Sequence, residues 1–170
     1  MNEVICTGVT QELVTELRKN REAALIHKVM ALMTENGNIV SIGFNETLKC
    51  LKLRMLKYIV LSALKYRFVV QLCDNNINNN VRIEFIQNEM ELNILKKKHK
   101  TTRMNLKTIS FISYFHSLCV QYNAELKLVN ASCQVTQKFD NDFGCIGVLH
   151  YAMDMCTCDP SLRLHSDLLN

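Results

Sequence analysis

Apolar residues recur at steps of three and four along most of the chain, which is the spacing of one face of an α-helix. The first such block runs from Thr10, a candidate N-cap, to about Thr34. It ends at an Asn/Gly cluster over residues 35–38, which is typical of a helix end followed by a turn. A second block begins after Asn45 and continues to about Cys73, long enough for one or two helices.

The remainder of the chain gives four further blocks with the same spacing. They cover residues 81–100, 101–122, 124–139 and 143–155. Between the blocks, residues 39–43 are interpreted as a buried connector, because a single short strand would have no partner. Six of the seven residues over 74–80 are Asp or Asn, which predicts a surface loop.

These blocks predict an all-α fold of six or seven helices. We expect a short α-solenoid of antiparallel HEAT-like helix pairs or, as the alternative, a compact helical bundle. The chain holds one Pro and five Gly in 170 residues, which argues against turn-rich β-sandwiches and glycine-rich nucleotide folds. A single interaction domain over residues 1–155 and a C-terminal tail over 156–170 follow from this pattern.

The net charge of +4 conceals an uneven distribution. Residues 49–107 hold 13 of the 20 Lys and Arg but 4 of the 16 Asp and Glu, giving +9 there and −5 elsewhere. A basic middle region predicts a surface for an anionic partner, either nucleic acid or an acidic protein face. The alternative is a set of solvated helix faces.

The most basic segment is the run Lys-Lys-Lys-His-Lys over residues 96–100. If one helix continues through it, four cations follow i, i+4, i+7 and i+11 from residue 96 and form a stripe that neutralises phosphates. No aromatic residue interleaves the stripe, so base stacking is not supported. The alternative is a lysine cluster that complements a helix dipole. The predicted contact residues are Lys96, Lys97, Lys100, Arg103 and Lys107, with Lys52 and Arg54 as weaker candidates.

Candidates for catalysis or metal binding are few. Cys145, His150, Cys156 and Cys158 come nearest to a metal site, but the spacing C-x4-H-x5-C-x-C is not that of a usual zinc knuckle. Buried thiols beside a surface histidine are the alternative interpretation. The five histidines are scattered, and no Cys–His motif for a nucleophile is recognisable. We expect no catalytic residue, no metal and no cofactor.

Targeting signals are also absent from the sequence pattern. No run reaches the roughly 18 apolar residues of a membrane span, and the first residues lack the features of a signal peptide. The eight cysteines are then expected to be thiols in a reducing compartment, the cytoplasm or the nucleus.

The order of parts across residues 60–155 gives a further indication. An expected helix over 59–68 is followed by a polar loop, a charged helix over 81–91, a Lys/Arg-rich stretch and the apolar segment 105–115. This order resembles the middle domain of eukaryotic translation initiation factor 4G, in which a charged helix leads into a segment reading roughly Asn-Ile-Arg-Phe-Ile-Gly-Glu-Leu-Phe. The residues that fit that segment are Ile109, Phe111, Ile112 and Phe115, whereas Ser110, Ser113 and Tyr114 replace the Arg, Gly and Glu of the family.

The resemblance implies a HEAT-type scaffold without chemistry of its own. Members of that family bind RNA, or dock an RNA helicase or another RNA-associated protein. The expected function is therefore a non-catalytic scaffold or adaptor in RNA metabolism, translation in particular, which binds RNA or a translation factor through a basic helical face. The alternative is a viral or regulatory helical bundle, host-modulating and apoptosis-inhibitor-like, that binds a partner's amphipathic helix in an apolar groove.

Overall fold

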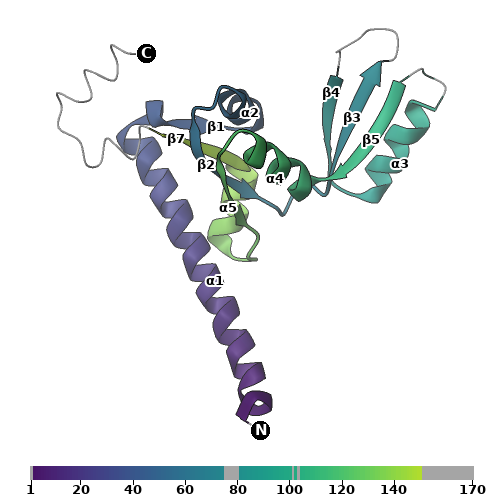
Figure 1. Ribbon diagram of the computed structural model, residues 1–170. Coiled ribbons are helices and arrows are strands. Elements are labelled where there is room, and N and C mark those ends of the chain that lie inside the picture. Colours follow the sequence, from purple (N-terminus) through teal and green to yellow (C-terminus); the bar gives the residue numbers. More distant parts are fainter. Residues whose placement is uncertain (1, 75–80, 101, 103, 151–170) are drawn as a thin grey trace, which may run out of the picture. The chain divides into compact units, whose positions relative to one another are not determined.

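The computed structural model describes residues 2–74, 81–100, 102 and 104–150, with side chains from residue 10 onward (Figure 1). The fold is α/β: those residues form five α-helices and seven strands in two sheets. They fall into two compact units. The first unit combines the residues up to Ser62 with those from Tyr122 onward, and the second unit covers Ala63–Gln121.

The first unit contains a four-stranded sheet with the order β1-β7-β2-β6. Its strands are β1 (Val40–Ile42), β2 (Leu56–Ser62), β6 (Glu125–Val129) and β7 (Cys145–Leu149). The strand β7 pairs antiparallel with β1 and β2, whereas β2 and β6 are parallel. Its helices are α1 (Asn2–Glu35), the short 3-10 turn Gly37–Ile39, α2 (Phe44–Lys52) and α5 (Gln134–Asp142).

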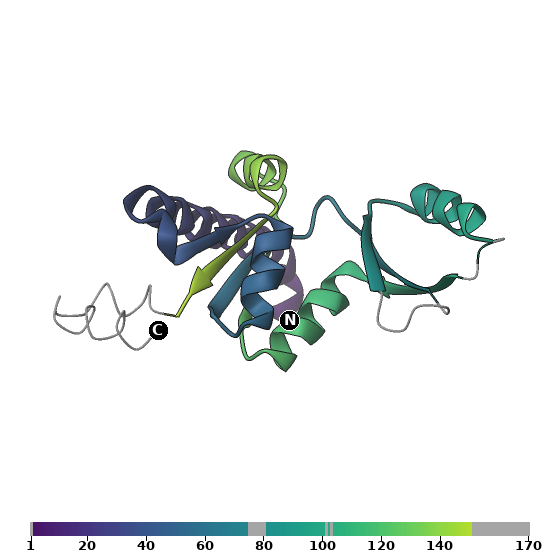
Figure 2. The same ribbon diagram turned by 90° about the horizontal axis from the view of Figure 1, so that it is seen from above.

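Helices cover both faces of this sheet (Figures 1 and 2). On one face, α1 and α5 enclose a cluster that includes Val60 and Ile146 from the two central strands and Phe139 from α5. On the other face α2 packs against β7 and β1, and the hydroxyls of Ser41 and Thr47 hydrogen-bond there at 3.0 Å. Because both faces are buried, the central strands consist almost entirely of apolar residues.

Two polar contacts tie the helices to the sheet of the first unit. The buried carboxylate of Glu22 on α1 accepts hydrogen bonds from the backbone amides of Asn130 and Ala131, at 3.1 and 2.6 Å. The Ser62 hydroxyl at the end of β2 donates to Asp140 of α5 at 2.7 Å. A buried carboxylate is stable only with such partners, so Glu22 fixes where α1 meets the loop after β6.

The second unit is built on a three-stranded antiparallel sheet with the order β4-β3-β5. Its elements are β3 (Phe68–Asp74), β4 (Val81–Ile86), α3 (Glu89–Lys98), β5 (Met104–Ser110) and α4 (Phe111–Gln121). The helix α3 packs on one face, where Leu92 and Leu95 contact Val70 and Leu72. At one end of the sheet, Phe111 and Phe115 of α4 form an aromatic cluster with Phe85.

The predicted all-α fold, whether solenoid or bundle, is therefore wrong, and so is the expectation of six or seven helices. The first block is a helix, although it begins at Asn2 rather than at Thr10. The second block is α2 followed by β2 and β3, and the next three each begin with a strand. The last block contains β7, and the connector over residues 39–43 contains β1, which does have a partner in β7.

The physical reason lies in two patterns that helical spacing obscured. In β4, apolar Val81, Ile83 and Phe85 alternate with charged residues, which is the period of a strand. In β2 the run Tyr58–Leu61 is apolar at every position because it is covered on both faces. Asn123 and Arg54 adopt positive φ values at points where the chain reverses, so these turns form without proline.

That residues 1–155 behave as one domain stays a prediction, and the tail expected over 156–170 lies outside the described residues, as does most of the loop over 74–80. Among the described helices, none combines the length and the apolar composition needed to cross a lipid bilayer.

The close approach of β1, β2 and β7 can be tested by substituting Gly147, which lies at the centre of the first sheet. A Cβ at this position would lie 2.5 Å from Ser41 Oγ and 2.8 Å from Leu56 Cδ1. Gly147→Ala is expected to lower the free energy of unfolding by about 1–3 kcal/mol, because the side chains of Ser41 and Leu56 would have to shift to admit the Cβ. Urea denaturation followed by circular dichroism measures it.

Gly37→Ala is the matched control, since nothing lies within 4 Å of the Cβ it would add. We expect its stability to stay within about 0.5 kcal/mol of the parent. Equal stability of the two variants would contradict the described packing around β7.

Candidate functional site

The basic run lies at the C-terminal end of α3, in the second unit. This helix begins with reciprocal capping: the Asn88 side chain accepts from the Glu91 amide, and the Glu91 carboxylate accepts from the Gln87 amide, both at 2.9 Å. Acidic residues occupy its first turn and lysines its last, so both ends complement the helix dipole. The dipole thus accounts for part of the clustering of the lysines.

The lysines themselves are presented to solvent. Lys96, Lys97, Lys98 and Lys100 are all exposed, while Leu92 and Leu95 hold the helix on the sheet. Within the described residues, none of these ammonium groups lies within 4.0 Å of a carboxylate. The arrangement concentrates uncompensated positive charge at one helix end, suited to contact with an anion.

The predicted continuous stripe is wrong, because α3 ends at Lys98 and β5 begins at Met104. Leu106 packs into the cluster beneath α3. The next residue, Lys107, therefore points to the opposite face of the sheet, since side chains alternate along a strand. Arg103 lies outside the described residues. The structure thus brings together Lys96, Lys97 and Lys100 but not Lys107.

The two weaker candidates belong to the first unit. Lys52 is exposed in the last turn of α2. Arg54 follows with a φ of 59°, and its guanidinium lies 5.5 Å from the ring centroid of Tyr122. At this distance the guanidinium makes a cation–π contact with the Tyr122 ring. The helix α3, by contrast, belongs to the second unit.

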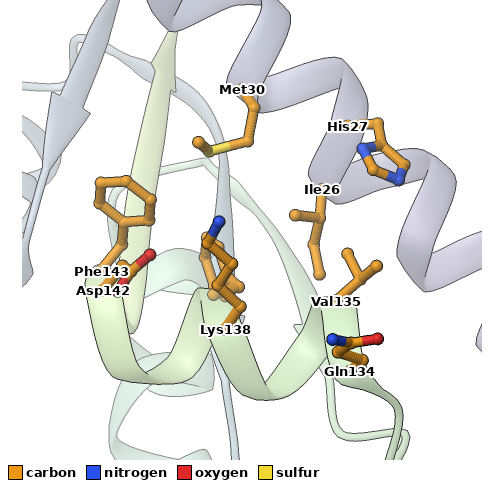
Figure 3. A pocket seen from close by; sticks show the side chains of 9 residues that line it. Ile26, His27, Met30, Gln134, Val135, Lys138, Asp142 and Phe143 are labelled. Carbon is orange, nitrogen blue, oxygen red and sulfur yellow. The ribbon is translucent and has the colours of Figure 1, made fainter.

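A second candidate site is a cleft of about 380 Å³ between α1 and α5, which the sequence analysis did not identify (Figure 3). Its apolar lining includes Ile26 and Met30 of α1 and Val135 and Phe139 of α5, residues spaced four apart on each helix. That spacing is the signal from which the cleft could have been found, since it places pairs on one face.

Polar groups stand at the rim of the cleft. They are His27, Gln134, Lys138 and Asp142. Figure 3 shows Lys138 extending from α5 toward α1. An apolar floor with a few polar groups at its mouth can hold an apolar side chain or a small amphipathic molecule.

The candidate metal ligands are not assembled among the residues that the structure describes. Cys145 is buried in β7, His150 is exposed just after it, and Cys156 and Cys158 lie outside the described residues. The described part of the chain contains no group of three or more His, Cys, Asp or Glu side chains that could hold a metal ion.

Two cysteines have the character of structural thiols. Burial raises the pKa of the Cys119 thiol to about 11. Burial also raises the pKa of Cys50, and the neighbouring Glu46 carboxylate adds to the shift. A nucleophilic cysteine needs a lowered pKa, so neither residue is prepared for covalent chemistry.

Comparison with known proteins supports the fold. The C-terminal domain of a peptide chain release factor from Methanosarcina mazei superposes with a TM-score of 0.68 at 11% identity, covering 91% of this chain and 97% of that domain. Pelota from Archaeoglobus fulgidus gives a TM-score of 0.51 at 11% identity over 87% of this chain, which corresponds to 35% of Pelota. No family model and no curated protein sequence matches the chain.

These likenesses replace the predicted resemblance to the middle domain of initiation factor 4G. The matched structures are α/β domains of the release-factor type, and no HEAT-type helix pair is present in the described residues. At 11% identity the likeness establishes the fold, not a shared activity.

The raised pKa of Cys119 predicts slow alkylation of the folded protein. At pH 8 only about one thiol in a thousand is ionised when the pKa is about 11. Iodoacetamide should therefore modify Cys133, which is partly exposed, well before Cys119. Mass spectrometry of digested samples measures the order, and unfolding in urea should equalise the two rates. Rapid native labelling of Cys119 would contradict its described environment.

Proposed function

We propose that this chain is a non-catalytic binding module of the translation apparatus that contacts RNA, or the acidic surface of an RNA-associated protein, through the basic end of α3. The observation that carries the proposal is the group Lys96, Lys97, Lys98 and Lys100, exposed and without a carboxylate partner within the described residues. The fold likeness to a release-factor domain supports the assignment to translation.

The chemistry of this surface suits backbone contact rather than sequence reading. Ammonium groups attract phosphates as point charges, and binding releases the counterions that surround the nucleic acid. Within α3 no aromatic side chain is present to stack on a base. The expected binding is therefore weakly selective for sequence and strongly dependent on salt. A role in translation would place it in the cytoplasm.

Charge reversal at the end of α3 tests this function. In the triple variant Lys96→Glu, Lys97→Glu and Lys100→Glu, affinity for a single-stranded RNA should fall at least tenfold. The slope of log affinity against log salt should become shallower by about 2–3, because each lysine accounts for about one unit. Fluorescence anisotropy between 50 and 300 mM salt, about the range in which phosphate contacts weaken, measures both.

A control variant with the same charge change separates a local effect from net charge. Arg18, Lys28 and Lys49 are exposed residues of the first unit, and their replacement by Glu should change RNA affinity less than threefold. If both variants bind equally, or if salt leaves binding unchanged, the assignment to α3 is wrong.

The cleft between α1 and α5 supports a second candidate function, the docking of an amphipathic helix of a partner protein. Its lining presents apolar side chains from two helices, and an anchor side chain of a third helix fits a space of about 380 Å³. The α/β fold excludes the helical bundle that was the alternative expectation for such binding. The cleft is present on the α/β fold itself.

The variant Val135→Glu tests the groove by placing a carboxylate in its apolar wall. Helical peptides displayed on phage and selected on the parent protein should lose at least tenfold in affinity for this variant. Their binding should change less than twofold between low and high salt, unlike RNA binding. Gln137→Glu, exposed on α5 outside the cleft, is the control. Equal enrichment of peptides on parent and Val135→Glu would exclude the cleft.

A further inference from the structure

The helix α1 carries an exposed stripe that its own unit does not cover. Every side chain from Thr10 to Arg18 is exposed, and residues at alternating steps of three and four lie on one face of the helix. They are Thr10, Leu13, Leu17, Asn20 and Ala24. Leu13 and Leu17 leave 58% and 54% of their surface in solvent, which is unusual for two neighbouring leucines of one helix face. Steps of three and four are the seam spacing of paired helices.

The buried side of the same helix points the other way. Glu22, Ile26 and Val29 contact the first unit and are almost fully buried. At 100° per residue, Ile26 lies about 180° around the helix from Leu17. The amino-terminal half of α1 also extends beyond the sheet of its unit (Figure 1). The core of the first unit therefore cannot bury the leucine stripe.

We propose that this stripe pairs with the same stripe of a second copy of the chain, so that two α1 helices associate side by side. Leu13 takes a d position, Leu17 takes the a position that follows it, and Asn20 takes the next d position. The helix is already held by its packed half, so pairing does not have to meet the full entropic penalty of helix nucleation.

Flanking charges determine the direction of the two helices. Glu16 and Arg21 lie on opposite flanks of the stripe and five residues apart, and both are exposed. In a parallel pair, this spacing places Glu16 of one copy against Arg21 of the other. An antiparallel pair would bring Arg21 close to the equivalent flank of the other copy, which carries Arg21 and Lys28. Charge complementarity therefore favours the parallel arrangement.

Sedimentation equilibrium of the whole chain, under reducing conditions that prevent disulfides, tests the association. We expect a weak dimer whose proportion rises with protein concentration. The variant Leu13→Asp with Leu17→Asp should raise the dissociation constant at least tenfold. The matched control, Gln11→Asp with Thr15→Asp, adds the same charge on the exposed far side of this helix segment and should change it less than twofold. A monomeric parent protein, or equal effects of both variants, would overturn the proposal.

A charge swap tests the direction without altering the leucines. Glu16→Arg alone should weaken the dimer at least threefold by placing two cations together. Adding Arg21→Glu should restore the parent affinity, because the pair re-forms with the charges exchanged. Failure of the second substitution to restore affinity would contradict the parallel pairing. RNA binding through α3 is independent of this result, since both variants leave the lysines of α3 unchanged.

Discussion

The double pairing of β2 is the constraint on which the rest of the structure depends. Residues Leu56–Ser62 lie between β7, to which they pair antiparallel, and β6, to which they pair in parallel. A parallel neighbour requires a long crossover, because the chain must return to the same end of the sheet before it re-enters. Here the crossover contains the entire second unit, from Ala63 to Gln121. The parallel pairing of β2 with β6 thus accounts both for the strand order of the first sheet and for the insertion of the second unit between these two strands.

The contrast between buried sheet faces and exposed helix surfaces explains where the candidate surfaces lie. The sheet of the first unit is covered on both faces, and its buried polar groups, such as Glu22 and Ser62, are used in structural hydrogen bonds. The buried thiol of Cys119 has a raised pKa and is equally unsuited to chemistry. The groups with unused binding capacity are peripheral: lysines at one helix end, a cleft between two helices and a leucine stripe. This distribution supports the proposed binding function.

Helices and charge clusters that depend on local composition could be predicted from the sequence. Strands that depend on pairing with distant segments could not. The long first helix and the basic end of α3 were predictable, because they follow from spacing and from consecutive lysines. The strands were not, since Tyr58–Leu61 is apolar at every position and fits a buried helix or a buried strand equally well. The alternation of Val81, Ile83 and Phe85 did carry a strand signal. Helical spacing over residues 81–100 obscured this signal, because the same segment continues into α3.

The rule that steps of three or four residues mark one helix face is wrong for the basic stripe and right for α1, for a single physical reason. A step of three or four residues has meaning only while the helix continues. Between Lys96 and Lys107 the helix ends at Lys98, so the predicted stripe is divided between two faces of a sheet. Along α1 the helix is unbroken, yet its apolar residues form two faces: Ile26 and Val29 point inward, whereas Leu13 and Leu17 point outward. Apolar residues on two sides of a helix that lies at the edge of its unit indicate two partners. One partner is the sheet of the first unit, and the other must come from outside it.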